Sequence, residues 1–513
     1  MARPIRTLVG MNTTTDVDIL VVGAGPAGLA TAVTALRHGA RVLICERRAG
    51  PSTHPRSTGL STRTMELARF WGIADAVRAG AIDCDPTVAI VETLRTPLEV
   101  LPLRAPTMRE SLAVSPTYPA IVAQDHLEPL LVEQVRVLGG EVRFDAPVIG
   151  LHSSPAGVLA QLRGGGRVRA RYVVGADGPR SAVRNALGIG WQRLGLTGHY
   201  EQALFRPDRP MTAGRPSMLA FAKHPDAGGV LLPTGGGRWS YVRERPAGSP
   251  VTGHDRWTDL LHVVTGLPAL RAVFLDVHPF VMAADVATTY RAGPGFLVGD
   301  AAHRMTPNAG AGLNTAVHDG HELGWRLAWR IRGLAGDALL DSWAAEREPV
   351  GRSLALRSLS ADRDPDDGLP RDLGGSYRSP VILDDGAAPA TGHLRTARPG
   401  ERAPHAWLRR QGRRSSVLDL FEDRMTLLTG PADAGWLAGA DRLAGIPIRT
   451  LSAAPELAAA YRLVAGSAVL VRPDGIIAWR HDGPAVDEAA ALVTAVDTAL
   501  GRAAAVPLRE RAG

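Results

Sequence analysis

A glycine-rich turn near the start of the chain is the feature that most constrains its fold. The apolar run Asp18–Val22 is followed at once by Gly23-Ala24-Gly25-Pro26-Ala27-Gly28. In a strand–turn–helix unit, Gly23 permits a tight turn, Gly25 lets a pyrophosphate approach the backbone, and Gly28 lets the helix pack on the strand. The pattern therefore predicts a buried parallel strand, then a helix over 27–38 whose N-terminus faces phosphate groups. The cofactor contacts expected here are Gly23, Gly25, Pro26, Ala27 and Gly28.

A second strand is predicted to end at an acidic residue. The run Arg41–Cys45 is followed by Glu46, which comes eighteen positions after Gly28. An acidic side chain at this place in such a unit accepts hydrogen bonds from the adenosine ribose. Arg47 is expected to contact the same ribose or a phosphate. These residues alone do not distinguish FAD from NAD as the ligand.

Two further motifs follow strand-like runs much later in the chain. The first is Ala176-Asp177-Gly178-Pro179-Arg180-Ser181, and the second is Gly299-Asp300-Ala301-Ala302-His303. In each, an acidic residue follows a buried strand, which is where parallel sheets place ligand-binding side chains. The Gly299 motif, the third of the chain, continues as a glycine-rich stretch, Pro307-Asn308-Ala309-Gly310-Ala311-Gly312-Leu313-Asn314. This stretch leads into a helix predicted over 313–333.

In this order the three motifs resemble one family, the single-component (group A) FAD-dependent aromatic hydroxylases with a para-hydroxybenzoate hydroxylase-like fold. The resemblance covers roughly 16–350, and more weakly the rest, where the chain looks most like polyketide and phenol hydroxylases with a C-terminal thioredoxin-like domain. It implies an α/β fold: a Rossmann-like FAD-binding domain, an inserted β-sheet substrate domain and a thioredoxin-like domain. It implies FAD as cofactor and NADPH or NADH as co-substrate.

The resemblance also assigns roles to individual residues. Arg56 would lie beside the flavin, where a fixed positive charge stabilises the anionic reduced ring and a developing hydroperoxide. Gln124 would bind the ribityl chain or a phosphate, with helix capping by Asp125 as the local explanation for that polar pair. Asp177 would serve FAD and the nicotinamide nucleotide, and Asp300 the ribityl hydroxyls. Backbone would cover the flavin edge at Pro307, Gly310, Gly312, Leu313 and Asn314.

Other polar and aromatic residues have weaker assignments. Arg180 and Arg184 stand near the start of a helix, where they are available for a phosphate. His303 is interpreted as an ordinary polar neighbour, and Trp325 and Trp329, four positions apart, as core packing. Between the second and third motifs, short β-like runs alternate with Pro/Gly turns. The residues expected to line a substrate cavity there include Phe221, Trp239, Tyr241 and Phe280, with plain core packing as the open alternative for each.

The domain boundaries follow from these assignments. We expect an FAD-binding domain over 16–184 plus 291–361, and a substrate-binding domain over 185–290 with parts of 85–120. Residues 362–397 are rich in Asp, Gly, Pro and Ala and are typical of a linker. The thioredoxin-like domain is expected over 398–503, with a hairpin at Pro473-Asp474-Gly475. No cysteine lies beyond Cys84, so thiol redox chemistry is excluded there, and a structural or homodimer-forming role is left.

Composition narrows the class of protein further. The 513 residues are 45% hydrophobic and 21% charged, as in ordinary globular domains. The net charge of +7 comes from dispersed arginines without interleaved aromatics, which argues against nucleic acid as a partner. No apolar run is long enough to span a membrane. Two cysteines, with Cys45 in a predicted buried strand, favour the reducing cytoplasm. The fifteen histidines show no metal-ligand spacing, so no metal is expected.

The function implied is an FAD-dependent monooxygenase. It would use NAD(P)H and O₂ to hydroxylate a phenolic or polyketide-type aromatic substrate through a flavin C4a-hydroperoxide. A Baeyer–Villiger or decarboxylating oxygenase on the same scaffold is the near alternative, because the motifs do not separate the two peroxide reactivities. A flavin-binding protein without monooxygenase turnover is the alternative from another class.

Overall fold

The computed structural model describes residues 14–103, 105–360, 373, 375–385, 396–410, 412–431 and 433–502. Its first sheet has the strand order β16-β17-β10-β1-β2-β7, in which β17, β10, β1, β2 and β7 run parallel. A hairpin, β8 and β9, extends it beside β10. The strands are β1 (Thr14–Val22), β2 (Val42–Cys45), β7 (Glu141–Arg143), β8 (Val148–Ser154), β9 (Gly157–Leu162), β10 (Arg167–Gly175), β16 (Arg291–Ala292) and β17 (Gly295–Leu297).

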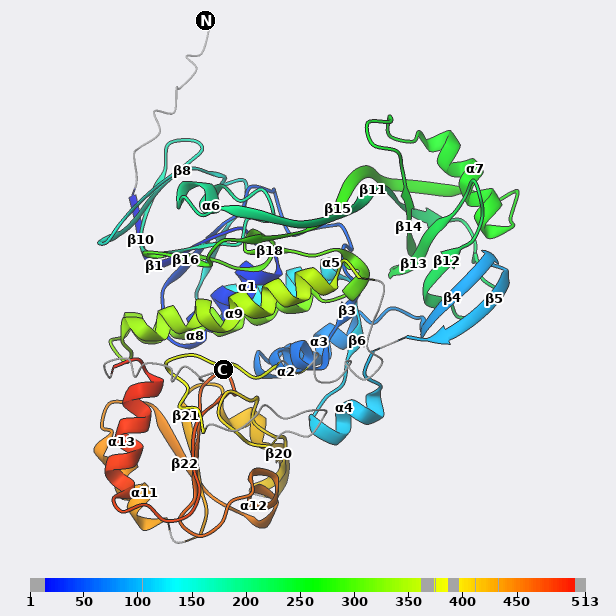
Figure 1. Cartoon of the computed structure of the whole chain (residues 1–513). Helices are drawn as coiled ribbons and strands as arrows, with labels where there is room; N and C mark the ends of the chain where they lie inside the picture. The colour runs from blue at the N-terminus through cyan, green and yellow to red at the C-terminus, as the bar shows by residue number, and fades with distance from the viewer. Residues whose placement is uncertain are drawn as a thin grey trace, which may run out of the picture.

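Helices α1 and α8 pack closely against each other on this sheet. A Cβ atom on Gly320 of α8 would lie 2.3 Å from the Ala27 carbonyl oxygen of α1, so only glycine allows the contact. The long helices α8 and α9 run side by side across the molecule (Figure 1). The helices of this part are α1 (Pro26–Arg37), α2 (Thr62–Phe70), α3 (Ala74–Ala79), α4 (Met108–Val114), α5 (Gln124–Val137), α6 (Ala182–Ala186), α8 (Gly312–Ile331) and α9 (Asp337–Arg357).

A second sheet has the order β18-β15-β11-β14-β13-β12-β4-β5. Its long strands β11 and β15 extend from the first domain to the part of the sheet beside α7 (Figure 1). The elements are β4 (Asp85–Thr93), β5 (Thr96–Pro102), β11 (Trp191–Pro207), β12 (Ser217–Ala222), β13 (Gly229–Gly235), β14 (Arg238–Glu244), α7 (His254–Thr265), β15 (Ala272–Ala287) and β18 (His303–Arg304). A separate short pair links β3 (Gly59–Leu60) with β6 (Ala120–Ile121).

The two faces of the second sheet differ. Trp257 and Leu260 of α7 are fully buried in one cluster with Ala203, Phe205 and further sheet residues. Because side chains alternate along a strand, the neighbours of these residues point to the opposite face. One row on that opposite face is fixed by the strand register and consists of Phe221, Val230, Val242, Gln202 and His278.

The C-terminal unit has the element order and the strand order β22-β21-β23-β24 of a thioredoxin-like fold, with β21 and β22 parallel. Its elements are β19 (Trp407–Arg410), β20 (Arg413–Ser416), β21 (Met425–Thr429), α11 (Ala434–Arg442), β22 (Ile448–Ser452), α12 (Pro455–Tyr461), β23 (Ala468–Val471), β24 (Ile477–His481) and α13 (Glu488–Ala499). The predicted hairpin turn is confirmed, with Gly475 at a φ of 75°.

Buried charges join the C-terminal unit to the first domain. Glu346 of α9 binds Arg472 through two contacts of 2.8 Å and Arg326 of α8 at 2.6 Å, and all three side chains are fully buried. Arg472 also binds Asp474 at 2.8 Å. Each buried charge is therefore paired, as a low-dielectric interior requires. The predicted packing role of Trp325 and Trp329 is confirmed, because both are buried in a core shared with this unit.

Part of the predicted 362–397 linker is packed rather than free of contacts. Among residues 375–385, Tyr377 donates its hydroxyl to Glu322 at 2.7 Å, and Val381 is buried in the core shared with the C-terminal unit. The rest of the predicted linker lies outside the described residues except for 373, 396 and 397. Within the described parts of the chain, no helix is both long enough and apolar enough to span a bilayer.

Candidate cofactor and substrate site

The three sequence motifs converge at one edge of the parallel sheet. Val22, which ends β1, is in register with Cys45 of β2 and with Gly175 of β10, and Gly175 is in register with Leu297 of β17. The residues that follow these strands therefore lie side by side, although they come from four distant parts of the chain. The carboxyl ends of parallel strands are where open α/β sheets bind ligands.

The glycine-rich turn leaves room for a ligand at one position only. Gly23 has a φ of 106°, and a Cβ atom there would lie 2.3 Å from the Ala176 carbonyl oxygen of the second motif. A Cβ atom on Gly28 would lie 2.1 Å from the Gly23 carbonyl oxygen. A Cβ atom on Gly25, by contrast, would meet no atom within 4 Å. This open space before α1 fits the pyrophosphate of a dinucleotide.

The N-terminus of α1 suits an anion. Pro26 and Ala27 form its first turn, Gly25 precedes them without a side-chain cap, and no acidic residue lies in that turn. The first backbone N–H groups of a helix have no partner within the helix, and they carry partial positive charge. The donors that a diphosphate needs are therefore present.

Glu46 lies at the end of β2, but local groups already hold its carboxylate. It accepts hydrogen bonds from the backbone N–H groups of Ala24 at 2.7 Å and Arg48 at 2.9 Å. Burial opposes ionisation of Glu46, and these hydrogen bonds overcome it and lower the pKa. Arg48 is a residue that the sequence analysis missed. Its position two residues after Glu46, in the bend that follows β2, was the available signal, whereas Arg47 is exposed.

Arg56 is an exposed cation on a braced loop. The backbone N–H of Ser52 donates to the buried Glu128 carboxylate at 2.7 Å, which fixes the loop to α5. The side chain of Arg56 forms no hydrogen bond or ion pair within the described residues, yet its charge acts on Asp300 and on His54. A positive charge without a fixed partner among the described residues therefore lies within electrostatic range of Asp300, and the flavin role of Arg56 stays a prediction.

The predicted cap at the start of α5 is wrong. The helix begins at Gln124 with Ala123 in the capping position and without a side-chain cap. Asp125 instead pairs with Arg238 of β14 at 2.6 Å, because an ion pair between the two domains is available to it. Gln124 donates its amide to Glu128 at 2.8 Å, which holds this predicted cofactor residue in a fixed orientation.

Asp177 and Arg184 both have local roles. Asp177 accepts hydrogen bonds from the Ser181 hydroxyl and from the backbone N–H of Ala182 at 2.7 Å, and burial raises its pKa. Arg184 donates to the carbonyl oxygen of Ala301 at 3.1 Å and is buried. The suggestion that Arg184 is available for a phosphate is therefore wrong. The hydrogen bond of Arg184 to Ala301 connects the second motif to the third. Arg180, the other arginine suggested for a phosphate, is exposed.

Asp300 projects from a short turn after β17. It is exposed at the surface, but enough protein surrounds it that desolvation raises its pKa, against the opposing charges of His303 and Arg56. Its side chain forms no hydrogen bond within the described residues. The carboxylate is therefore available for hydroxyl donors such as those of a ribityl chain.

A buried acid beneath that turn was missed in the sequence analysis. Asp319 of α8 accepts hydrogen bonds from the Gly299 backbone N–H at 3.0 Å, from His303 at 2.6 Å and from Arg347 at 2.8 Å. Burial works against its ionisation, yet the charges of His303 and Arg347 lower its pKa to about 2. Asp319 thus holds the backbone that presents Asp300. An acid within the buried stretch of α8 was the available signal.

The glycine-rich loop before α8 combines open backbone with one structural side chain. A Cβ atom on Gly310 or Gly312 would meet no described atom within 4 Å, and Leu313 begins the buried face of the helix. Asn314 accepts from the Ser61 backbone at 2.8 Å and donates to the Gly59 carbonyl at 3.1 Å. Its side chain therefore holds the loop in place, while free N–H groups at the helix start remain for a ligand. Pro307, also predicted to cover the flavin, is exposed.

The predicted substrate-lining residues fall on opposite faces of the second sheet. Trp239 and Tyr241 pack under α7, and Tyr241 is fully buried with its hydroxyl on the Ala227 carbonyl at 2.5 Å. They do not fit the predicted cavity-lining role, because odd-numbered positions of β14 face α7. Phe221 is 39% exposed on the other face. That face also contacts the loop of Arg56 through His54 and His278, whose rings are 4.9 Å apart.

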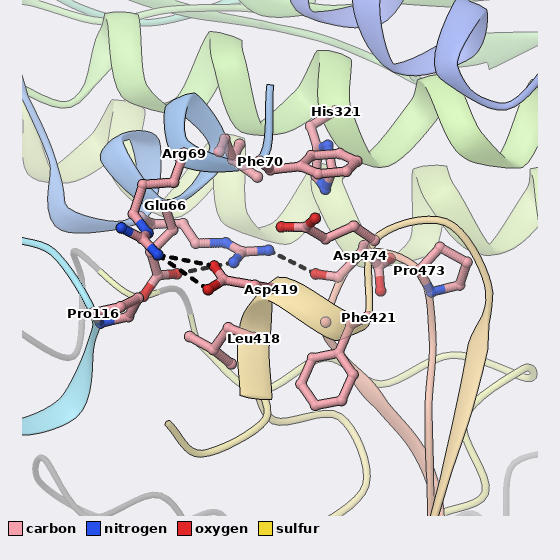
Figure 2. A pocket seen from close by; sticks show the side chains of 14 residues that line it. Glu66, Arg69, Phe70, Pro116, His321, Leu418, Asp419, Phe421, Pro473 and Asp474 are labelled. Atoms are coloured by element: carbon pink, nitrogen blue, oxygen red, sulfur yellow. Dashed lines mark hydrogen bonds and ion pairs between the residues drawn. The ribbon is translucent and has the colours of Figure 1, made fainter. Parts of the chain in front are cut away.

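A separate recess lies between α2, α8 and the C-terminal unit. It encloses about 390 Å³ including its open mouth, and none of the predicted cofactor residues lines it. Figure 2 shows His321 pointing into the recess from α8 and the Arg69–Asp419 ion pair, which measures 3.0 Å, at its side. Burial and the nearby charge of Asp419 raise the pKa of Glu422, another lining residue, to about 8.

Comparison with known proteins agrees with the converging motifs. Residues 16–358 match the family described as FAD binding domain, and residues 396–503 match the aromatic-ring hydroxylase C-terminal family. Aklavinone 12-hydroxylase of Streptomyces purpurascens is 36% identical, over 93% of this chain and 97% of its own length. Tetracenomycin A2 monooxygenase-dioxygenase of Streptomyces glaucescens is 33% identical, over 96% and 98%.

The fold leads to the same family. The crystal structure of a ternary complex of aklavinone-11 hydroxylase with FAD and aklavinone superposes with a TM-score of 0.86 at 35% identity, covering 96% of this chain and all of that one. The sequence predictions of fold class, FAD cofactor and hydroxylase function are thereby confirmed. The chain belongs to the FAD-binding aromatic-ring hydroxylases and is an FAD-dependent monooxygenase.

Proposed function

We propose that this enzyme uses NADPH or NADH and O₂ to hydroxylate one ring of a fused-ring aromatic polyketide. The observation that carries the proposal is the match, over nearly the whole chain, to a hydroxylase solved together with FAD and aklavinone. Two relatives named as aklavinone 12-hydroxylases match 93% and 82% of this chain. The roles given below to Phe221 and to the cofactor residues are part of this proposal.

Some residues of the chain would bind FAD, and others would stabilise the charge that develops on its ring. Bound FAD supplies the oxygen chemistry, since no protein side chain activates O₂ in this way. The open turn at Gly25 and the start of α1 bind its pyrophosphate. Asp300 accepts hydrogen bonds from hydroxyl groups, and Glu46 orients the ribose. Arg56 and the N-terminus of α8 hold positive charge where the reduced ring gains negative charge.

The second sheet supplies a flat aromatic surface for the substrate. On the face that meets the Arg56 loop, Tyr200 and Phe280 stack with ring centroids 5.9 Å apart, and Phe221 lies on the same face. Such rings bind a planar polycyclic substrate by stacking and apolar burial. They also keep water from the reacting ring, which favours oxygen transfer over unproductive release.

The test is turnover of the purified yellow protein with a panel of phenols and fused-ring polyketides. We expect one class of fused-ring compound to stimulate NAD(P)H oxidation strongly and to gain one oxygen atom from ¹⁸O₂ as a ring hydroxyl. Product structure by NMR separates this from the alternatives. A lactone or loss of CO₂ would assign the Baeyer–Villiger or decarboxylating reaction, and equal oxidation without any aromatic compound would contradict the proposal.

A further inference from the structure

A cluster of two histidines and one aspartate lies between the Arg56 loop and the second sheet. His54 belongs to the loop, and Asp276 and His278 alternate on β15, so both point to the same face. One nitrogen of each ring and one oxygen of the carboxylate all lie within 4.8 Å of one another. Local sequence spacing could not reveal this cluster, because the fold brings His54 to a distant strand.

Hydrogen bonds within the described protein leave polar atoms of this cluster without partners. Both ring nitrogens of His54 are buried and have no hydrogen-bond partner among the residues that the structure describes. Nε2 of His54 lies 3.3 Å from Oδ2 of Asp276, and Nδ1 of His278 approaches the same oxygen at 2.5 Å. Buried polar atoms without a partner are rare in native proteins, and an ion or a water accounts for many of them.

We propose that His54, Asp276 and His278 bind one divalent transition-metal ion of the zinc class. Two imidazoles and one carboxylate form a donor set that zinc uses, with a fourth position open to water. A tetrahedral site with zinc–ligand bonds of 2.0–2.2 Å spaces its donor atoms by about 3.4 Å. The 3.3 Å separation of His54 and Asp276 already meets this, and His278 moves back when the carboxylate exchanges its hydrogen bond for the ion.

The surroundings offer access from solvent and a nearby acidic side chain. The side chains of Asp276 and His278 are 44% and 38% exposed, so an ion reaches the site from solvent and the two groups have room to adjust. Asp125 acts on His54 through its charge, and within the described parts of the chain its Oδ1 is buried and free of hydrogen bonds, including any to His54. Such an acceptor is what a ligating histidine needs for its other ring N–H. Arg56 repels the ion, and the charge of Asp276 offsets this.

Occupation would fasten the loop that bears Arg56 to the strand that bears Phe280. This site is independent of the substrate assignment, because its ligands are fixed by the fold alone. The ion would hold the second sheet against the loop that bears Arg56. Zinc is then expected to raise the midpoint of thermal unfolding of the wild type, since a ligand that binds only the folded state stabilises it.

The experiment uses the tag-free FAD-bound enzyme, stripped with a chelator and equilibrated with zinc sulfate. Equilibrium dialysis with elemental analysis should give about one zinc per chain, and His278→Ala and Asp276→Asn should each lose more than about tenfold in affinity. His152→Ala, which removes an exposed histidine of β8, serves as the matched control and should bind like the wild type. Visible flavin absorbance and circular dichroism check that each variant is folded.

A crystal soaked in zinc and measured at the zinc absorption edge locates the ion directly. An anomalous peak among His54, Asp276 and His278 is expected. No saturable zinc binding by the wild type, or equal retention by the folded His278→Ala and Asp276→Asn variants, would overturn the proposal. So would a thermal shift with zinc that persists in His278→Ala.

Discussion

Gly28 packs so closely on Gly23 that a Cβ atom at position 28 would lie 2.1 Å from the Gly23 carbonyl oxygen. Gly25, between them, faces open space and has backbone angles that any residue adopts. We therefore expect Gly25→Val to fold and to lose FAD, because its side chain occupies only the approach of the pyrophosphate. Gly28→Val should fail to fold. Circular dichroism and flavin absorbance of the purified variants test this pair, and a yellow Gly25→Val protein would contradict it.

Removal of the charge of Arg56 should lower the midpoint potential of the bound flavin. Without that cation the anionic reduced ring loses electrostatic stabilisation, so Arg56→Gln should be reduced less readily and turn over about 10²-fold more slowly. Potentiometric titration with a dye of known potential measures the midpoint potential of the flavin. The control is Arg95→Gln, which changes an exposed arginine in the turn between β4 and β5. An unchanged midpoint potential in Arg56→Gln would contradict a role of Arg56 in stabilising the reduced flavin.

Substitutions on the two faces of the second sheet should separate binding from stability. Phe221→Ala should raise the KM for a fused-ring substrate and leave the unfolding midpoint nearly unchanged, because Phe221 is partly exposed. Tyr241→Phe should leave KM unchanged and destabilise the fold by about 1 kcal/mol, since it removes one buried hydrogen bond. Steady-state kinetics give the KM of each variant, and urea unfolding gives the free energy of unfolding of each. The reverse pattern would place the substrate on the α7 face.

Glu422 should make the protein less stable as the pH rises. Its folded pKa of about 8 exceeds the ordinary value of 4.5. Between these values the folded chain keeps a proton that the unfolded chain has released, so stability falls with rising pH across this window and stays lower above it. Glu422→Gln should therefore gain stability over the wild type at about pH 9 and not at about pH 5, in urea unfolding. The exposed Glu456→Gln should show no such difference.

Loss of the Asp319 charge should disturb the turn that presents Asp300. Asp319→Asn leaves Arg347 and His303 buried beside a neutral group, and removal of one partner from a buried ion pair destabilises by about 3–5 kcal/mol. We expect a lower unfolding midpoint together with weaker FAD retention in gel filtration. Asp341→Asn, whose side chain is 71% exposed, is the control. Full FAD retention in a destabilised Asp319→Asn would limit its role to stability.

The sequence predicted where the cofactor binds because the strand ends are locally encoded. Apolar runs ending in glycine or aspartate mark β1, β10 and β17, and parallel pairing then brings these ends together whatever the intervening chain does. The hydrogen-bond and ion-pair partners of individual side chains were less predictable. Asp125 and Arg184 bind partners that are distant in sequence, and no local pattern identifies such partners.

The choice of sheet face was also beyond the sequence. Aromatic residues alternate along β14 in the pattern of a half-buried strand, and this pattern indicates that one face is buried but not what covers it. Helix α7 covers the face on which Tyr241 lies. Gln202, His278 and Phe280 therefore lie on the opposite face, which contacts the Arg56 loop through His278. A one-residue difference in position decides between core and cavity.

The ion pair of Glu346 with Arg472 bears on how such an enzyme can change during evolution. Glu346 and Arg472 come from different domains, and each would be an isolated charge in an apolar interior if the other domain were lost or exchanged. Deletion or recombination at the domain boundary therefore carries a penalty that point substitutions elsewhere do not. The ion pair thus favours keeping the C-terminal unit together with its partner domain, even though the unit has no cysteines with which to perform the redox chemistry of a thioredoxin-like fold.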